Sequence, residues 1–181
     1  MTSAPGPVAV ITGANGGLGF ATALALARSG MRVVMACRSP HKGDEARKAL
    51  LAEVPDAHAT LIPLDVSESE SIREFGLRLA EQVDGVDLLV NNAGIVLVPL
   101  ARNSLGHELH LATNHLGPFA LTGTLLPLLR ARRQARVINV GSLAHRFTRL
   151  DLDDLNWETT PYGEWKAYAR SKLAQIGRAH V

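Results

Sequence analysis

The chain has 181 residues, of which 46% are hydrophobic and 20% are charged, and its formal net charge is +2. This length and composition indicate one globular domain with a buried core, and the small net charge gives no reason to expect a nucleic-acid partner. Because there is one cysteine, no signal-peptide pattern and no apolar run of bilayer length, we expect a cytoplasmic protein without an intrachain disulfide or a membrane span.

The first half of the chain alternates apolar strands with segments of helical composition. In chain order we expect a strand at Val8–Thr12, a helix at Leu18–Arg28, a strand at Arg32–Cys37, a helix at His41–Glu53 and a strand at Thr60–Val66. Ser67 and Glu70 have the spacing of a capping box, which predicts that Ser67 caps a helix running to about Val83.

The second half repeats this alternation. We expect a strand at Val86–Val90, a helix at Ser104–Arg130 with bends at Pro118 and Pro127, a strand at Arg136–Val140 and a helix from about Tyr162. Strands that are apolar on both faces and separated by helices predict a Rossmann-like, doubly wound parallel sheet in a three-layer αβα arrangement. Such a sheet binds its ligand beyond the carboxyl ends of the strands, where the strand order reverses.

A glycine-rich turn from Thr12 to Gly19 joins the first strand to the first helix. Glycines let the backbone approach a phosphate closely, and the N–H groups at a helix N-terminus bind anions. A tight turn without a ligand is the alternative, but the position between the first strand and the first helix favours phosphate binding. After the second strand, Arg38 follows Cys37 with no acid beside it, which favours NADP, with its 2′-phosphate, over NAD. An ordinary surface arginine is the alternative for Arg38.

Three groups suited to acid–base chemistry stand near the fifth strand and the last helix. Ser142 follows the strand, and Tyr168 and Lys172 are separated by one helical turn, so their side chains share a helical face. Free tyrosine, with a pKa of about 10, is a poor base at neutral pH, and a neighbouring ammonium stabilises its phenolate. Taken alone, this tyrosine–lysine spacing is common by chance and usually marks a surface pair.

Taken together, these motifs resemble the short-chain dehydrogenase/reductase family over nearly the whole chain. The motifs that carry the resemblance are the glycine turn, Asn91–Gly94, Ser142, Tyr168 and Lys172. Three further runs are similar to the retinol-dehydrogenase-like branch: Ala36–Ser39, Asn114–Gly117 and Arg136–His145. The resemblance implies an oxidoreductase that transfers a hydride between NADP(H) and a carbonyl or alcohol substrate, with NAD as the less favoured cofactor. It also implies a homo-dimer or tetramer.

The resemblance assigns roles to individual residues. It implies that Tyr168 is the general acid or base, that Lys172 binds the nicotinamide ribose and activates Tyr168, and that Ser142 positions the substrate. It implies that Asn114 supports a water-mediated proton relay. The cofactor-binding residues that it implies are Gly13, Asn15, Gly17, Leu18, Gly19, Arg38, Asp65, Val66, Asn91, Ala93, Gly94, Tyr168 and Lys172. Gly16 stands where many NADP-dependent members have a basic residue, so the NADP prediction depends on Arg38.

Other readings of the sequence remain as alternatives. A redox sensor binds NADP without chemistry, but such proteins lose the tyrosine or the lysine, and both are present here. A related epimerase usually has a different glycine spacing, and nothing in the sequence favours a scaffold protein. His107 and His110 are helical neighbours that suggest a metal, but no further ligand is evident. We therefore expect no metal and a capping or solvated role for these histidines.

The last six residues, Ile176–Val181, depart from the pattern that continues the tyrosine helix in the family. They can be written as the codons ATC GGA AGA GCA CAC GTC, a string that resembles a widely used sequencing adapter. We therefore expect a single domain over residues 1–175 and a non-native tail over residues 176–181. Because family members add a further strand and a closing loop after this helix, we expect an incomplete domain with an unpaired sheet edge or an uncovered apolar face. We also expect the 181-residue chain to have little or no activity, as an inactive fragment of the enzyme.

Overall fold

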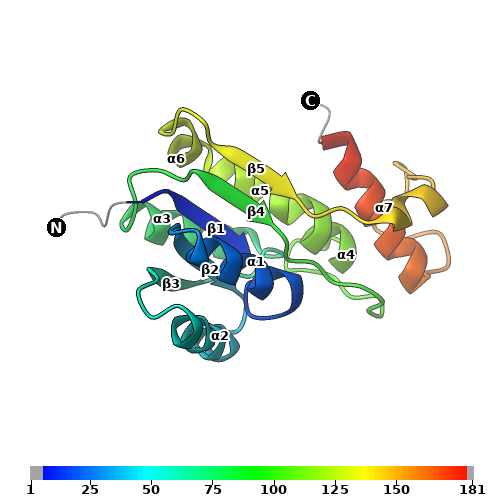
Figure 1. The fold of residues 1–181 in the computed structure, drawn as a ribbon. Coiled ribbons are helices and arrows are strands. Elements are labelled where there is room, and N and C mark those ends of the chain that lie inside the picture. The colour runs from blue at the N-terminus through cyan, green and yellow to red at the C-terminus, as the bar shows by residue number, and fades with distance from the viewer. Residues whose placement is uncertain (1–5, 179–181) are drawn as a thin grey trace.

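The computed structural model describes residues 6–178 and contains a five-stranded parallel sheet between two layers of helices (Figure 1). The strands are β1 (Val8–Thr12), β2 (Arg32–Cys37), β3 (Ala59–Pro63), β4 (Leu88–Asn91) and β5 (Arg136–Asn139). Their order is β3-β2-β1-β4-β5, and every neighbouring pair is parallel. The order reverses beside β1, so the predicted doubly wound α/β fold is confirmed.

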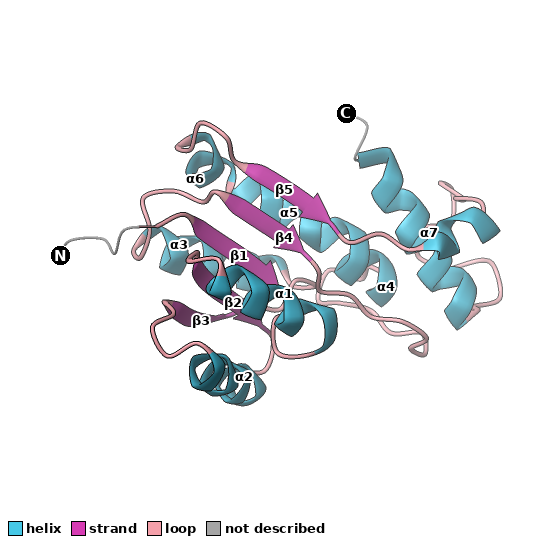
Figure 2. Ribbon diagram, in the orientation of Figure 1, coloured by secondary structure: helices cyan, strands magenta, loops and turns pink. Residues whose placement is uncertain are grey.

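Helices follow most of the strands, as Figure 2 shows. They are α1 (Gly17–Arg28), α2 (Pro40–Glu53), α3 (Ser69–Ala80), α4 (Leu109–Leu111), α5 (Gly117–Thr124), α6 (Leu126–Arg130) and α7 (Glu164–Arg178). A π-helix at Ala112–Leu116 joins α4 to α5, and a 3-10 helix at Leu143–Phe147 follows β5. Within residues 6–178, no helix is both long and apolar enough to cross a membrane.

Alternate side chains of β1 face the two helical layers. Val8 and Val10 belong to a core shared with α3, α5 and α6, whereas Ala9 and Ile11 belong to a core shared with α1 and α2. Successive side chains of a strand point to opposite faces, so a strand that is apolar throughout serves both cores. Full burial of a side chain such as Ile11 stabilises the fold by about 1.5–3 kcal/mol. The sheet is therefore a rigid platform for the loops at its carboxyl edge.

The predicted capping box at the start of α3 is wrong. Glu68 is the N-cap residue, and its side chain forms no capping hydrogen bond. The Ser67 hydroxyl instead donates to Oδ1 of Asp65 at 2.6 Å, and the same oxygen accepts from the Ser67 N–H at 2.9 Å. Glu70 pairs with Arg73 on the helix surface. The aspartate two positions earlier thus competes successfully for the serine. The preceding strand also ends earlier than predicted, at Pro63.

The long helix predicted from Ser104 is also wrong over its first residues. A loop is closed there by Asn103, whose Oδ1 accepts from the N–H groups of Leu105 at 3.1 Å and His107 at 2.9 Å. The helical segments begin only at Leu109. They are divided close to the two prolines, where α5 and α6 begin, and the bends themselves stay a prediction.

The last strand and the last helix complete the described chain. β5 pairs with β4 and forms one edge of the sheet, and Val137 and Ile138 are 38% and 47% exposed. The predicted unpaired edge with apolar side chains is thus confirmed for the described residues. α7 lies beyond the carboxyl end of β5 (Figure 1) and runs to Arg178. Residues 176–178 of the predicted non-native tail are thus part of this helix. Residues 179–181 lie outside the described residues.

Candidate active site

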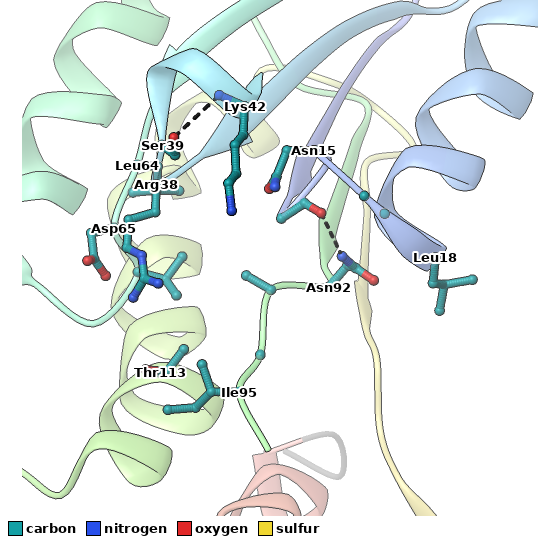
Figure 3. Close-up of a pocket in the computed structure, with 16 residues that line it drawn as sticks. Asn15, Leu18, Arg38, Ser39, Lys42, Leu64, Asp65, Asn92, Ile95 and Thr113 are labelled. Carbon is teal, nitrogen blue, oxygen red and sulfur yellow. Dashed lines mark hydrogen bonds between the residues drawn. The ribbon is translucent and has the colours of Figure 1, made fainter. Parts of the chain in front are cut away.

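A cleft of about 430 Å³ opens at the carboxyl ends of β1, β2 and β4 (Figure 3). Its position matches the point where the strand order reverses. It is lined by Gly13, Asn15, Gly16, Leu18, Gly19, Arg38, Ser39, Lys42, Leu64, Asp65, Val66, Asn92, Ala93, Gly94, Ile95 and Thr113. Most of the residues that the sequence predicts for cofactor binding are in this set. Gly17, Asn91, Tyr168 and Lys172 do not line the cleft.

The glycine turn has a shape that only small residues permit. Gly13 has a φ of 65°, a left-handed conformation that favours glycine, and its N–H donates to the carbonyl oxygen of Ala36 at 2.8 Å. A Cβ at Gly19 would clash with the carbonyl oxygen of Gly13 and would lie 2.5 Å from Nδ2 of Asn92. Gly16 is different, because nothing lies within 4 Å of the place where its Cβ would be. Because Gly13 and Gly19 carry no side chain, the first turn of α1 packs closely against the end of β1.

A small network of hydrogen bonds holds this turn against the segment that follows β4. The Thr12 hydroxyl accepts from the N–H groups of Asn92 at 3.0 Å and Ala93 at 2.9 Å. Nδ2 of Asn92 donates to the carbonyl oxygen of Thr12 at 2.8 Å. The sequence analysis missed this role of Thr12. The signal that could have indicated it is a hydroxyl side chain at the end of an otherwise apolar strand. This network fixes two walls of the cleft relative to each other.

Two cations enter the cleft from the start of α2. Figure 3 shows the side chains of Arg38 and Lys42 extending into the cleft from this side. The N–H of Lys42 donates to Oγ of Ser39 at 3.3 Å, so the cap of the helix also orients its first turn. On the same helix, Lys48 pairs with Asp44 at 2.8 Å, whereas neither Arg38 nor Lys42 forms an ion pair with residues 6–178. The sequence analysis missed Lys42, although it stands one helical turn after Arg38.

Asp65 and Val66 form the wall of the cleft after β3. The N–H of Asp65 donates to Oγ of Ser71 at 2.9 Å, and its carboxylate is held by Ser67. A Cβ at Gly117 would collide with the carbonyl oxygen of Val66. Glycine at the start of α5 thus lets that helix approach this wall closely, a requirement that the sequence pattern did not reveal.

Asn114 is buried on the π-helix and joins three chain segments. Its Oδ1 accepts from the N–H of Ile95 at 2.9 Å, and its Nδ2 donates to the carbonyl oxygen of Ile95 at 3.0 Å. Nδ2 also donates to Oγ of Ser171 on α7 at 2.9 Å. The loop after β4 is therefore tied to α7 through one amide. π-helical turns of this kind occur frequently at functional sites.

Lys172 brings α7 to the edge of the cleft. Its Nζ donates to the carbonyl oxygen of Val140 at 2.9 Å, and the side chain is almost fully buried. A Cβ at Gly94, which lines the cleft, would lie 3.8 Å from Nζ of Lys172 and 3.1 Å from Oδ1 of Asn114. Burial lowers the pKa of Lys172 below its ordinary value, because desolvation penalises the ammonium. An ammonium has three donors, so two remain for other partners.

Tyr168 and Ser142 lie on two elements that pack together. Tyr168 is half-buried one turn before Lys172, and its ring contacts those of Trp165, with centroids 5.9 Å apart, and His110, with centroids 6.3 Å apart. Ser142 caps the 3-10 helix, and its Oγ accepts from the N–H of Ala144 at 3.2 Å. α7 packs against that helix. Tyr168, Lys172 and Ser142 thus come from neighbouring elements beyond the sheet.

The capping or solvated role expected for His110 is wrong. His110 is 0% exposed, and its Nδ1 lies 2.8 Å from Oε1 of Glu108, itself buried. The Tyr162 hydroxyl donates to the same Oε1 at 2.9 Å. Burial opposes ionisation of Glu108, but the hydrogen bonds from His110, Leu111 and Tyr162 outweigh it and hold its pKa below the ordinary value. The sequence analysis missed this cluster, because Tyr162 is distant in sequence.

Asn91 serves the sheet instead of the cleft. Its Nδ2 donates to Oδ1 of Asn139 at 2.9 Å and to Oγ1 of Thr122 at 3.2 Å. These bonds join β4 to β5 and to α5. They brace the sheet at the carboxyl end of β4, and Asn91 does not line the cleft.

Two further side-chain types bear on the chemistry. Cys37 is buried, and burial raises the pKa of its thiol to about 11, so it stays protonated and acts as a packed side chain at neutral pH. Among residues 6–178, no three His, Cys, Asp or Glu side chains are grouped so that they could hold a metal ion.

Comparison with known proteins places this geometry among relatives. A family model described as short chain dehydrogenase matches residues 7–151. Retinol dehydrogenase 13 of Homo sapiens is 43% identical over 172 residues, which are 95% of this chain and 52% of the relative. Polyprenol dehydrogenase of Mus musculus is 43% identical over 174 residues, which are 94% of this chain and 52% of the relative. The chain thus spans about half the length of the curated relatives it matches.

Solved structures give the same result for the fold. An uncharacterised protein from Mycobacterium paratuberculosis has a TM-score of 0.80 and 42% identity, covering 97% of this chain and 63% of that protein. A metagenomic short-chain oxidoreductase in complex with NADP has a TM-score of 0.76 and 28% identity, covering 98% of this chain and 75% of that protein.

Proposed function

This chain belongs to the short-chain dehydrogenase family, and on that premise we propose that it forms the NADP-binding and catalytic part of an oxidoreductase. The reaction is hydride transfer between NADP(H) and a carbonyl or alcohol substrate. One observation carries the proposal. Lys172 of α7 and Asn114 of the π-helix converge on Gly94, which lines the cleft beside the glycine turn. The proposed acid–base helix therefore meets the proposed dinucleotide site.

The cleft fits a dinucleotide phosphate in shape and charge. Gly13 and Gly19 leave no side chain between the backbone and a pyrophosphate at the start of α1. Arg38 and Lys42 supply two cations without ion-pair partners in the described chain, which suits the 2′-phosphate that distinguishes NADP from NAD. An NADP complex of a structural relative supports the same cofactor.

The remaining cofactor contacts follow from the lining of the cleft. We assign the adenosine side to Asp65 and Val66, and the ribose to Ala93 and Gly94. The nicotinamide end lies toward Lys172, whose two remaining ammonium donors suit ribose hydroxyls. NADPH, when bound, supplies the hydride.

The side chains near the substrate oxygen handle the proton. Tyr168 donates a proton to the carbonyl oxygen during reduction, or accepts it from the alcohol during oxidation. Ser142 donates a hydrogen bond to the same oxygen and so holds it in place. Because the Lys172 ammonium is buried, a phenolate on Tyr168 gives it a favourable partner, and the ammonium in turn stabilises the phenolate. Asn114 supports a water-mediated relay by fixing the loop at Ile95.

The substrate proposed here is a lipophilic alcohol or aldehyde. Leu143 and Phe147 stand beside Ser142 and are 71% and 74% exposed, so apolar surface borders the reacting hydroxyl. The names of the relatives, retinol and polyprenol dehydrogenases, support the same class. Assembly into a homo-dimer or tetramer stays a prediction, which sedimentation of the purified chain tests.

Binding and turnover test the proposal in two steps. NADPH and NADH are titrated against the purified 181-residue chain by fluorescence, and NADPH oxidation is then followed with an apolar aldehyde. Tighter binding of NADPH, together with turnover that Tyr168→Phe abolishes, supports the proposed reaction. Binding without turnover favours the redox sensor or an inactive fragment, and equal affinity for both nucleotides contradicts the role of Arg38. Failure to bind either nucleotide overturns the proposal.

A further inference from the structure

A buried polar cluster lies beside Tyr168 and outside the machinery proposed above. It consists of Glu108 and His110 at the start of α4 and of Tyr162, which precedes α7. Glu108 and His110 are 1% and 0% exposed. Burying ionisable side chains costs free energy unless they are closely paired, so these groups cost more free energy to bury than apolar side chains of similar size. Apolar side chains would suffice if the cluster only filled space.

The hydrogen bonds of the cluster define its protonation. Nε2 of His110 accepts from the N–H of Val98 at 3.4 Å, so the ring proton resides on Nδ1, which donates to Glu108 at 2.8 Å. The Tyr162 hydroxyl lies 2.9 Å from Oε1 of Glu108 and 3.2 Å from the carbonyl oxygen of Val98. The Glu108 carboxylate also accepts from the N–H groups of His110 at 3.0 Å and Leu111 at 2.8 Å. One carboxylate therefore collects donors from two parts of the chain, the start of α4 and Tyr162.

These bonds tie together the segments that surround Tyr168. Val98 belongs to the loop after β4, the same loop whose Ile95 is held by Asn114. Tyr162 stands just before α7, the helix that carries Tyr168. The His110 ring meets the Tyr168 ring edge-on, with an interplanar angle of 63°. A displacement of the imidazole is thus transmitted directly to the phenol and to the loop.

We propose that Glu108, His110 and Tyr162 form a positioning clamp that fixes the Tyr168 ring against the loop after β4. This inference rests on the proposed function of Tyr168 and adds the residues that orient it. His110 is a positioning residue and touches no reacting atom. The clamp holds the phenol in one orientation, and a misplacement of about 1 Å at a reacting group can cost roughly a hundredfold in rate.

Tyrosine NMR on the full chain tests the clamp without requiring turnover. The chain has two tyrosines, so a sample labelled with ¹³C in the tyrosine rings gives two sets of ring signals, which Tyr162→Phe assigns. His110→Leu removes every hydrogen bond of the ring, whereas His110→Gln keeps an amide donor for Glu108 and an amide oxygen for the Val98 N–H. His107→Leu is the matched control, since its side chain lies outside the cluster and its bonds to Asn103 come from the backbone N–H and carbonyl oxygen.

The expected outcome is specific to positioning. His110→Leu should move the Tyr168 signals toward those of free tyrosine and broaden them, and NADPH should no longer shift them, while NADPH affinity stays unchanged. His110→Gln should restore both the signals and their response to NADPH, and His107→Leu should change neither. Tyr162→Phe, which removes one hydroxyl and should fold, is expected to produce part of the effect on Tyr168.

Two results separate failure of the clamp from failure of the proposed function. Unchanged Tyr168 signals in folded His110→Leu overturn the clamp, whatever the chain binds. If His110→Leu does not fold, unchanged Tyr168 signals in Tyr162→Phe overturn it equally. Loss of NADPH binding by the wild-type chain overturns the proposed function instead.

Discussion

Nζ of Lys172 lies 2.9 Å from the carbonyl oxygen of Val140, so the last helix is hydrogen-bonded to the chain that leaves the edge strand. This bond places a buried ammonium at the edge of the cleft. Burial lowers the pKa of Lys172, which means that the folded state tolerates the charged form less well than the unfolded state does. The site thus holds a charge that the fold alone does not favour.

Removal of this charge should preserve or increase the stability of the chain. Lys172→Met keeps the length of the side chain, so we expect the free energy of unfolding at pH 7 not to fall. Because the pKa of Lys172 is lower in the folded state, wild-type stability should rise as pH increases from that value toward about 10.4, its value in the unfolded chain. The difference in the free energy of unfolding between Lys172→Met and the wild type, measured by urea titration, should therefore become smaller as pH rises. A marked loss of stability at pH 7 would contradict the assignment.

Discrimination between the two nicotinamide cofactors should depend on two side chains. Arg38→Ala and Lys42→Ala should each weaken NADPH binding by about tenfold or more, because hydrogen bonds to charged groups contribute about 1.5–3 kcal/mol. Affinity for NADH should stay the same, since it lacks the 2′-phosphate. Lys48→Ala is the control, because Lys48 is on the same helix but pairs with Asp44. The measurement is fluorescence titration at fixed salt, and an equal loss for both nucleotides would argue against this assignment.

The glycine turn should respond unequally at two of its positions. Gly19→Ala forces a Cβ into the carbonyl oxygen of Gly13, so we expect a loss of about 1–3 kcal/mol of stability and of nucleotide binding. Gly16→Ala places its Cβ in open space, and its extended φ of −177° suits any residue, so stability should be nearly unchanged. Thermal unfolding with and without NADPH measures both effects. Similar behaviour of the two variants would contradict the close approach of helix and strand.

Acid should destabilise the chain partly through Glu108. Its pKa is held below the ordinary value in the folded state, so it contributes stability that is fully present above its unfolded value of about 4.3 and is lost as pH falls through the folded value. Glu108→Gln should therefore lower stability at pH 7 by about 1–3 kcal/mol and flatten the decline at acid pH. Glu70→Gln, at an exposed ion pair with Arg73, is expected to have little effect. A decline of unchanged steepness in Glu108→Gln would remove this explanation.

Sequence patterns predicted the sheet well because its strands are short apolar runs with clear ends. The bounds of β1 and β2 match the prediction at both ends, since Gly13 follows the first strand and Arg38 follows the second. The start of α4 could not be predicted in the same way. Helical composition continues from Ser104, but the Asn103 side chain folds that stretch into a loop through bonds that composition does not report.

The residues of the candidate site differ in the same way, because local sequence determines some of their roles and distant contacts determine the others. The glycine turn and Arg38 could be predicted, because local spacing determines what each can do. The placement of His110 could not, since its partner Tyr162 lies 52 positions away and the pair meets only after α7 has packed. The bond from Asn91 to Asn139 could not be predicted, because Asn139 lies on another strand, and contact of Asn91 with a cofactor stays a prediction.

The edge strand β5 has a consequence for handling the protein. Among the described strands it pairs only with β4, and Val137 and Ile138 expose apolar surface along it. Strands of other molecules can pair with an exposed edge of this kind, so aggregation in concentrated samples should begin at β5. Ile138→Lys would add a repelling charge at this edge and should slow aggregation in solution.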